Sequence, residues 1–512
     1  MYYPDLAEFK RQAEKATVIP IYRELLADLE TPVSAFRKID DGRYSFLLES
    51  VEGGEKWGRY SFLGISPSVI FRVEGNQVSI EKNGKKTFFP HEGDPLDCLR
   101  RLLGQYRSVC VEGLPRFYGG AVGFLSYEMA DYLEKLPPKK EVSFCPEEAI
   151  FMITELLLIF DNQKKTIKII ANTLINEQDE LENLYLGAIQ KIEDLIKRLT
   201  REQKPTPPLS REGKISLKPD LKPKEFEAKV LRAKSYIEEG DIIQVVLSRR
   251  FTTSKVADEF DLYRALRFIN PSPYMFFLRF NGLVIVGSSP EVMVRLTDGL
   301  AELRPIAGTR TRGNTESEDR CLANELLNDP KERAEHVMLV DLGRNDLGRI
   351  ARVGSVQVNE LMVVERYSHV MHLVSHIQAY LEKDKDAFNV IKATFPAGTL
   401  TGAPKVRAME IIRELEPVNR GPYGGAVGYI GFNGNMDMAI TIRTIFVKDE
   451  KIYLQAGAGI VADSDPQREL EEVDNKIKGM IKALELAARG LKLYPAAPGD
   501  NETRCNVDNR KE

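Results

Sequence analysis

Short apolar runs separated by turn residues dominate the first part of the chain. Between about residues 19 and 173, runs rich in Val, Ile, Leu, Phe and Tyr alternate with Gly, Asn and Asp. This pattern is typical of β-strands joined by tight turns, and it predicts an antiparallel sheet. The clearest strand candidates are residues 44–48, 69–73, 77–80, 149–160 and 165–171.

The spacing of apolar residues changes after residue 177. Leucine and isoleucine recur every three or four positions up to residue 199, with charges between them, which predicts a helix. Residues 201–224 contain several prolines and many charges, the composition of a solvated linker. We therefore predict an N-terminal domain over residues 19–200 and a linker over residues 201–224.

The second half of the chain mixes both periodicities. Strands are predicted at residues 242–251, 274–280, 283–287, 292–296, 426–432, 438–447 and 452–458, and helices near 226–239, 317–328, 387–393 and 467–488. These elements predict one domain over residues 225–488, followed by a polar, flexible tail over residues 494–512. The predicted fold class is α+β, with antiparallel β-sheets packed as a sandwich and surrounded by helices.

Composition excludes several classes of protein. The 512 residues are 43% hydrophobic and 29% charged, as in a soluble globular protein of two to four domain-sized units. The net charge of −4 gives no basic excess for nucleic acid. The longest apolar run, residues 150–160, is far shorter than the roughly 20 residues of a membrane helix. Five scattered cysteines without a CxxC pair and the lack of a signal-peptide core favour a cytoplasmic location.

Two pairs of glutamates carry candidate metal chemistry. Glu332 and Glu335 are three residues apart, as are Glu469 and Glu472, so each pair would share one face of a helix. If the two helices converge, their carboxylates could hold a hard cation such as Mg²⁺, which prefers oxygen ligands. Solvated helix faces would give the same pattern.

Glycine-rich segments form a second group of candidates, at residues 305–313, 398–405, 420–428 and 455–459. Glycines allow backbone N–H groups to approach an anion closely, although tight turns between strands also use them. None of the segments matches a phosphate-binding or dinucleotide-binding fingerprint. Arg443 lies inside an apolar run, where a guanidinium binds either a ligand carboxylate or a structural partner.

Several of these segments, in this order, resemble the chorismate-utilising enzymes, and most closely the component I family of anthranilate synthases. The matching segments are residues 305–310 (PIAGTR), 334–346 (AEHVMLVDLGRND), 367–375 (YSHVMHLVS), 398–405 (GTLTGAPK) and 455–459 (QAGAG), with 47–50 (LLES) and 58–64 (GRYSFLG) in the first half. The resemblance implies an enzyme of tryptophan biosynthesis that converts chorismate and ammonia to anthranilate and pyruvate with Mg²⁺.

The resemblance also implies roles for individual residues. Glu335 and Glu472 would bind Mg²⁺, and His372 would be the catalytic histidine, assisted by Glu291 and Thr399. The remaining residues would bind chorismate, lining its ring or clamping its enolpyruvyl carboxylate: Gly308, Thr309, Tyr423, Arg443, Gly457, Ala458 and Gly459.

A regulatory site and a partner are implied as well. Tryptophan, the end product, would bind at the contact between the two domains and inhibit the enzyme. Its site would consist of Leu48, Glu49, Ser50, Pro273, Tyr274 and Met275. Ammonia derived from glutamine would come from a separate glutamine amidotransferase subunit, because no cysteine here lies in a glycine-flanked nucleophile turn.

Ala307 separates the closest alternatives. Aminodeoxychorismate synthase component I enzymes usually carry a lysine at this position, where its amine attacks chorismate, and isochorismate and salicylate synthases use a lysine near there to activate water. Alanine offers no nucleophile, which favours direct attack by ammonia. A non-catalytic amino-acid-binding regulator would have no need for Glu335, His372 and Glu472 together.

Overall fold

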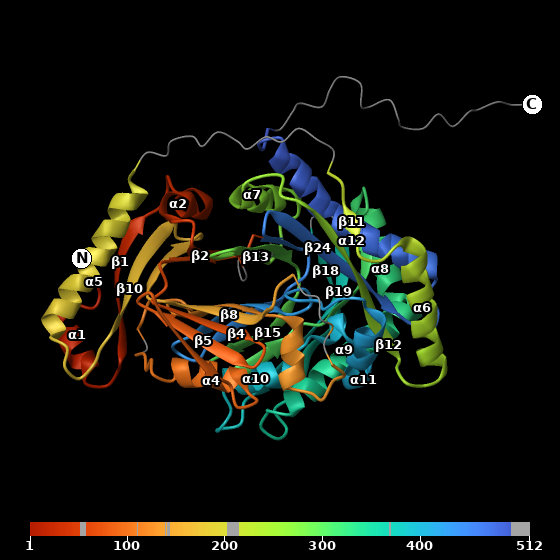
Figure 1. Ribbon diagram of the computed structural model, residues 1–512, viewed down its shortest axis with the longest axis horizontal. Helices are drawn as coiled ribbons and strands as arrows, with labels where there is room; N and C mark the ends of the chain where they lie inside the picture. The colour runs from red at the N-terminus through yellow and green to blue at the C-terminus, as the bar shows by residue number, and fades with distance from the viewer. Residues whose placement is uncertain are drawn as a thin grey trace, which may run out of the picture.

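Two antiparallel sheets form the centre of the molecule (Figure 1). The computed structural model describes residues 1–51, 58–109, 111–138, 140, 144–201, 215–367 and 370–492. Within these residues each sheet has twelve strands, and every strand pairing is antiparallel. The α+β class predicted from the sequence is confirmed.

The first sheet combines strands from both halves of the chain. Its strand order is β1 (Val18–Leu26), β10 (Thr166–Leu174), β9 (Leu156–Asp161), β3 (Tyr60–Ile65), β2 (Tyr44–Glu49), β13 (Tyr274–Phe280), β14 (Leu283–Ser289), β23 (Thr444–Lys448), β24 (Lys451–Ile460), β12 (Gln244–Ser254) and β11 (Lys218–Pro219), with β20 (Gly402–Ala403) paired to β12. The two halves join where β2 pairs with β13, which places Glu49 opposite Met275.

The second sheet is shared in the same way. Its order is β17 (Ile306–Thr311), β19 (Val370–Tyr380), β16 (Leu300–Leu303), β15 (Val292–Thr297), β22 (Met436–Ile440), β21 (Ala426–Gly431), β7 (Gly120–Leu125), β8 (Glu147–Thr154), β4 (Val69–Glu74), β5 (Gln77–Lys82) and β6 (Lys85–Pro90), with β18 (Gln357–Arg366) paired to β19. Neither sheet therefore belongs to one predicted domain. Most of the predicted linker, residues 202–214, and the predicted tail, residues 494–512, lie outside the described residues.

Two strand predictions are wrong. The predicted strand over residues 438–447 is divided, because β22 ends at Ile440 in the second sheet and β23 begins at Thr444 in the first. The apolar run over residues 149–160 is not a single strand, because β8 ends at Thr154 in the second sheet and β9 begins at Leu156 in the first. The chain crosses between the sheets at Glu155, whose carbonyl accepts the Asn172 N–H at 2.7 Å and whose carboxylate pairs with Lys191 at 3.7 Å. The charged side chain interrupts the apolar run at the point where the chain leaves one sheet.

Aromatic residues hold the two sheets face to face. Phe124 of β7 packs edge-on against Phe280 of β13, with ring centroids 5.4 Å apart, and Phe62 of β3 meets Tyr429 of β21 at 6.0 Å. Such tilted pairs are favourable for aromatic rings and bury large apolar areas. This core makes the two sheets a sandwich.

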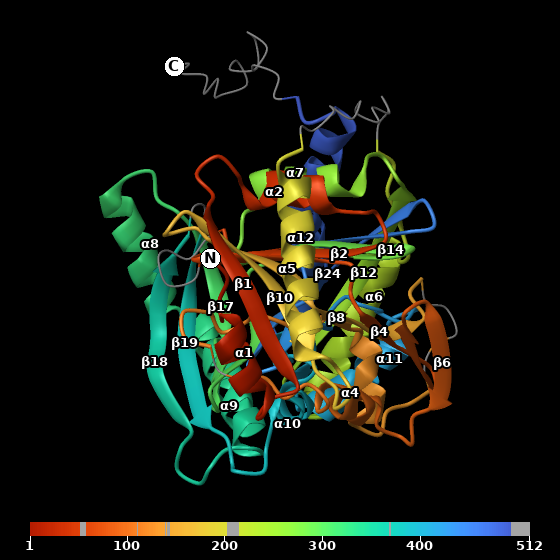
Figure 2. The same cartoon turned by 90° about the vertical axis from the view of Figure 1, so that its left-hand side faces the viewer.

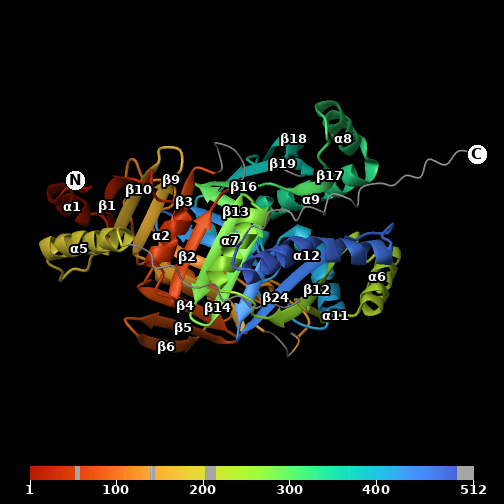
Figure 3. The same ribbon diagram turned by 90° about the horizontal axis from the view of Figure 1, so that it is seen from above.

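Helices cover the outer faces of the sandwich (Figures 1 and 3). Over the first sheet lie α1 (Leu6–Ala13), α2 (Pro32–Ile39), α5 (Leu181–Leu199), α6 (Pro223–Glu238), α7 (Glu259–Ile269), α11 (Lys405–Leu415) and α12 (Pro466–Ala488). Around the second lie α4 (Pro95–Leu103), α8 (Glu316–Asn328), α9 (Pro330–Gly348) and α10 (Ala387–Thr394), with the short helices η1 (Tyr127–Tyr132) and η2 (Gly398–Leu400). Among the described residues, no helix combines the length and apolar character needed to cross a membrane.

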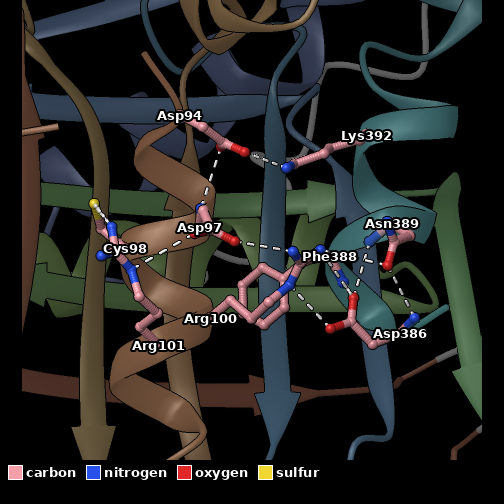
Figure 4. Close-up of polar contacts among 9 residues, drawn as sticks. All are labelled: Asp94, Asp97, Cys98, Arg100, Arg101, Asp386, Phe388, Asn389 and Lys392. Atoms are coloured by element: carbon pink, nitrogen blue, oxygen red, sulfur yellow. Dashed lines mark hydrogen bonds and ion pairs between the residues drawn. The ribbon is translucent and has the colours of Figure 1, made fainter. Parts of the chain in front are cut away.

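Two helices from opposite halves of the chain, α4 and α10, are joined by ion pairs (Figure 4). Arg100 of α4 contacts Asp386, the N-cap of α10, with Nε 3.0 Å from Oδ2. Lys392 of α10 in turn pairs with Asp94, the N-cap of α4. Each helix thus supplies a cation to the capping carboxylate of the other.

At one side of the molecule, α8 and the strands β17, β18 and β19 lie together (Figures 2 and 3). Helix α9 follows α8 directly, begins with Asp329 as its N-cap and packs on β17 and β19. The N-cap accepts the N–H groups of Lys331 and Glu332, which fixes the first turn of the helix. That turn carries Glu332, and Glu335 follows in the next turn of the helix.

Candidate active site

A cavity of about 870 Å³ brings most of the predicted site residues together. Its walls come from α9, α12, β12, β17, β19 and β24, and from the loops around η2 and residues 420–425. The predicted residues that line it are Glu291, Gly308, Thr309, Glu335, His372, Thr399, Tyr423, Arg443, Gly457, Gly459 and Glu472. Ala458 is fully buried beside them in β24.

The two predicted metal ligands face this cavity from different helices. Glu335 lies on α9 and Glu472 on α12. Burial raises the pKa of Glu335, the negative charges of Glu332 and Glu472 raise it further, and a hydrogen bond from Gln244 opposes the shift. Gln244 Nε2 donates to Glu335 Oε1 at 3.3 Å, while Gln244 Oε1 is buried without a hydrogen-bond partner among the described residues. The cavity thus holds an excess of carboxylates and an unused amide oxygen.

Lys476, one turn after Glu472 on α12, is a site residue that the sequence analysis missed. Its ammonium lies 2.7 Å from Glu472 Oε1 and donates to the carbonyl oxygen of Gly457 at 2.8 Å. The signal in the sequence is the four-residue spacing, which puts both side chains on one helix face. Lys476 links the acidic side of the cavity to the glycine-rich end of β24.

A bulge in β17 positions the predicted catalytic histidine. The register between β17 and β19 shifts between Ala307 and Thr309, and Gly308 has a φ of 66°, a backbone conformation that favours glycine. His372 Nδ1 lies 3.0 Å from the Gly308 carbonyl oxygen and 3.1 Å from Thr309 Oγ1. Burial lowers the pKa of His372, and the nearby Arg443 charge acts in the same direction.

Glu291 and Thr399 form a hydrogen-bonded pair in another wall of the cavity. Thr399 Oγ1 donates to Glu291 Oε2 at 3.0 Å. Burial raises the pKa of Glu291, while the hydrogen bond from Thr399 and the charges of Lys476 and Arg443 oppose the shift. The carboxyl group therefore holds its proton at higher pH than a glutamate in water.

Arg443 supplies positive charge to the same space. It has a φ of 49°, and burial lowers its pKa. Within the described part of the chain its guanidinium has no hydrogen-bond or ion-pair partner, so all its donors are available to a ligand. Gly457 lies nearby, and a side chain there would meet the Leu247 carbonyl oxygen at 2.8 Å and the Tyr423 hydroxyl at 3.0 Å. Together these groups form a cationic, donor-rich pocket.

The predicted inhibitor residues lie at the seam between the chain halves. Glu49 and Leu48 in β2 pair with Met275 and Phe276 in β13, and Ser50 follows β2. The buried Glu49 carboxylate accepts hydrogen bonds from Tyr263 and Arg267 of α7. Pro273 lines the large cavity, which brings this seam next to it.

Tyr274 points into a buried polar cluster. Its hydroxyl donates to Asp437 at 2.9 Å and accepts from Arg295 at 3.0 Å. Arg116, from the first half of the chain, also pairs with Asp437, at 2.8 Å. The seam therefore continues as an ion-pair network into the second sheet.

Comparison with known proteins places the chain in a family. The family described as chorismate binding enzyme matches residues 52–482. Anthranilate synthase component 1 of Acetivibrio thermocellus is 47% identical over 494 residues, 95% of this chain and 99% of the relative. That of Aquifex aeolicus is 48% identical over 490 residues, 94% of this chain and 98% of the relative.

Two solved structures are similar to this chain over most of its length. Anthranilate synthase component I from Streptococcus pneumoniae is 37% identical, with a TM-score of 0.72 over 89% of this chain and 99% of its own. The menaquinone-specific isochorismate synthase from Escherichia coli shares the fold, with a TM-score of 0.68, at 20% identity over 94% of this chain and 98% of its own. This chain is a chorismate-binding enzyme, and within that class it belongs to the anthranilate synthase component I family.

Proposed function

We propose that the cavity converts chorismate and ammonia to anthranilate, pyruvate and water. The observation that carries this proposal is that Glu335 and Glu472 from two helices face Arg443 and His372 within one cavity. An acidic side and a cationic side suit a dicarboxylate substrate that binds partly through a metal. The names of the relatives support the same reaction.

The donor set of the acidic side fits Mg²⁺. Within the described residues, no three His, Cys, Asp or Glu side chains are grouped to hold a metal. Two carboxylates suit Mg²⁺, which keeps waters and substrate oxygens in its other positions. Bound between Glu335 and Glu472, the ion would act as a Lewis acid on the ring carboxylate of chorismate, assisting attack at carbon 2.

Glu291 and Thr399 assist the first step. Ammonia forms a bond to ring carbon 2, both ring double bonds shift by one position, and the bond from carbon 4 to its hydroxyl breaks, after which the bonded nitrogen loses a proton. Glu291 donates a proton to the departing hydroxyl, which leaves as water, and Thr399 orients the carboxyl group through its hydrogen bond. The raised pKa of Glu291 increases the fraction that carries this proton.

His372 serves the elimination of pyruvate. Because the Gly308 carbonyl can only accept, Nδ1 of His372 carries the ring proton and Nε2 is left with a free lone pair. Nε2 removes the proton from carbon 2, a double bond forms between carbons 2 and 3, and the bond from carbon 3 to the enolpyruvyl oxygen breaks. The ring becomes aromatic, and pyruvate leaves as its enolate, which takes up a proton. The lowered pKa keeps the imidazole neutral and able to act as this base.

The cationic side binds the enolpyruvyl carboxylate. Arg443 donates to it, with the Tyr423 hydroxyl and the N–H groups of Gly457, Ala458 and Gly459 nearby. Ala307 lines the same cavity and leaves room for ammonia where the related aminodeoxychorismate synthases place a lysine. Alanine at this position argues against that alternative reaction.

Regulation and partnership complete the proposal. Tryptophan binds at the seam formed by Leu48, Glu49, Ser50, Pro273, Tyr274 and Met275 and inhibits the enzyme. A glutamine amidotransferase subunit delivers ammonia, so the working form is a hetero-oligomer. The enzyme works in the cytoplasm, where Cys98, Cys145 and Cys321 remain reduced thiols.

A single assay tests the reaction. The purified chain is incubated with chorismate, ammonium sulfate and Mg²⁺, and products are separated by chromatography. We expect the 2-amino product, anthranilate, together with pyruvate, and loss of both when Mg²⁺ is chelated. A 4-amino product would identify an aminodeoxychorismate synthase, and absence of any product would overturn the proposal.

A further inference from the structure

Arg420 and Glu416 form a buried ion pair beside the cavity. Their side chains are 1% and 5% exposed. Arg420 Nε donates to Glu416 Oε2 at 2.9 Å and Nη2 donates to Oε1 at 2.7 Å. Burying two charges rarely increases stability, because the desolvation penalty offsets their attraction. The other contacts of this pair therefore indicate what it does.

The remaining donors of Arg420 reach two walls of the cavity. Nη1 donates to the Leu400 carbonyl oxygen at 2.6 Å and Nη2 to the Val246 carbonyl oxygen at 2.8 Å. Both residues line the cavity, and Leu400 directly follows Thr399. The guanidinium also lies 5.8 Å from the ring centre of Tyr423. One side chain thus connects β12, the η2 segment and the loop that carries Tyr423.

Glu416 contacts β12 as well, two residues further along at Ser248. Its Oε1 accepts hydrogen bonds from both the backbone N–H and the hydroxyl of Ser248, each at 2.8 Å. Ser248 Oγ in turn accepts from Gln455 Nε2 at 2.8 Å, and Ser248 is the register partner of Gly457 in the pairing of β12 with β24. Gln455 and Gly457 both line the cavity. Glu416 therefore holds β12, and through Ser248 and the pairing of β12 with β24 it acts on the strand that presents the carboxylate-binding amides.

We propose that Arg420 and Glu416 are positioning residues for the reaction, holding Thr399 through Leu400 and Gly457 through Ser248. The pair has two arms: the hydrogen bond from Arg420 to Leu400, and the hydrogen bonds from Ser248 to Glu416. The inference rests on the proposed function, because it assigns these two arms to two parts of the proposed site. The arm through Leu400 serves the chemical step, since Thr399 orients Glu291. The arm through Ser248 serves substrate binding, since the amides of β24 hold chorismate before and during the reaction.

Two substitutions separate the arms. Arg420→Lys keeps the charge, but one ammonium cannot reach Glu416, Leu400 and Val246 in their separate directions. We expect kcat to fall about 10²-fold, as small misplacements of catalytic groups do. Ser248→Ala removes only one hydroxyl, and we expect the KM for chorismate to rise about fivefold with kcat within about twofold of the wild type.

A matched control measures the general effect of disturbing a buried arginine. Arg279 of β13 is 13% exposed, pairs with Asp40 and Glu259 at 3.4 Å, and lies outside the cavity lining. Arg279→Lys should lower the unfolding midpoint while kcat and KM stay at wild-type values. Equal losses of kcat in Arg279→Lys and Arg420→Lys would overturn the positioning role.

The double variant Arg420→Met/Glu416→Leu adds a test that leaves no unpaired buried charge. We expect a folded protein by circular dichroism whose kcat remains about 10²-fold low. Wild-type kcat and KM in this variant, or an unchanged KM for chorismate in Ser248→Ala, would overturn the proposal. A wild-type chain without any anthranilate would instead overturn the proposed function, and with it the positioning role.

Discussion

The ammonium of Lys476 lies 2.7 Å from Glu472 Oε1, and Glu472 faces Glu335 in the same cavity. In the absence of a metal, the lysine partly neutralises one of the two carboxylates. A divalent cation that binds both glutamates therefore competes with Lys476 for Glu472. This relationship makes the proposed metal site testable through the two glutamates and through the lysine.

Removing either carboxylate should weaken Mg²⁺ binding. Glu335→Gln and Glu472→Gln each replace one of the two carboxylates with a neutral amide. We expect at least about tenfold lower Mg²⁺ affinity, with a parallel loss of turnover. Isothermal titration with Mg²⁺ measures the affinity directly. Glu485→Gln, on an exposed position of the same helix α12, is the matched control and should change neither quantity. Wild-type affinity in both cavity variants would contradict the assignment.

Removing Lys476 should increase the affinity for Mg²⁺. Lys476→Met leaves Glu472 unpaired, so we expect Mg²⁺ to bind the substrate-free enzyme severalfold more tightly, as for a half-exposed ion pair worth about 1 kcal/mol. Lys476 also holds the Gly457 carbonyl, so the KM for chorismate should rise in the same variant. Titration of the free enzyme, followed by steady-state kinetics, separates the two effects. Weaker Mg²⁺ binding would show that the lysine does not compete.

The pH dependence of turnover should reflect the buried imidazole. Because burial lowers the pKa of His372, the neutral base persists to a pH below the usual histidine value of about 6.5. We expect kcat to stay constant as the pH falls to 6.5 and to decrease only below it. The profile is measured at saturating Mg²⁺, which keeps Glu335 ionised. His372→Gln should remove this acid limb together with most of the activity, whereas an acid limb above pH 6.5 would contradict a buried neutral base.

Sequence patterns predicted local elements well and long-range pairing poorly. The helices predicted at residues 317–328, 387–393 and 467–488 match α8, α10 and α12 within a residue or two, because their apolar positions follow the helical period. The pairing of β2 with β13 could not be predicted, since a strand's alternation says which face is buried but not which strand lies beside it. The same limit hid the division of residues 149–160 and of residues 438–447 between the two sheets.

The candidate site was likewise predicted only in part from the sequence. The residues drawn from the family resemblance line one cavity, apart from the buried Ala458 and the inhibitor residues other than Pro273. Gln244, Lys476 and the Arg420–Glu416 pair were missed because they act through other residues. Their partners, such as the Leu400 and Gly457 carbonyls, are backbone atoms whose positions depend on the fold. Neither side-chain type nor spacing reveals such contacts.

Tryptophan inhibition should depend on the seam between the chain halves. Tyr263 and Arg267 hold the Glu49 carboxylate in place, so it is oriented before an amino group arrives. A phenylalanine ring at position 50 would fill the space beside it. We expect Ser50→Phe to raise the inhibition constant for tryptophan at least about tenfold, more than it changes kcat. Thr87→Phe, on an exposed position of β6, is the control, and an unchanged inhibition constant in Ser50→Phe would refute the site.

Variants at the α4–α10 contact can distinguish the contribution of the helix caps to stability from that of the ion pairs (Figure 4). Asp386 accepts the N–H groups of Phe388 and Asn389 at 3.0 and 3.1 Å, and it also pairs with Arg100. Because Arg100 and Asp386 are 31% and 46% exposed, Arg100→Met should cost less than about 1 kcal/mol of unfolding free energy.

Asp386→Ala loses the cap as well as the ion pair, so it should cost about 1–2 kcal/mol. Asp386→Asn keeps a capping oxygen and removes only the charge, so it should cost less than Asp386→Ala. Urea unfolding monitored by circular dichroism gives all three values. If Asp386→Asn costs as much as Asp386→Ala, the charge rather than the cap holds α10, and the ranking is wrong. Since α10 leads into the segment that carries Thr399, a loss of turnover in Asp386→Ala beyond that in Asp386→Asn would show that the cap also positions this proposed catalytic residue.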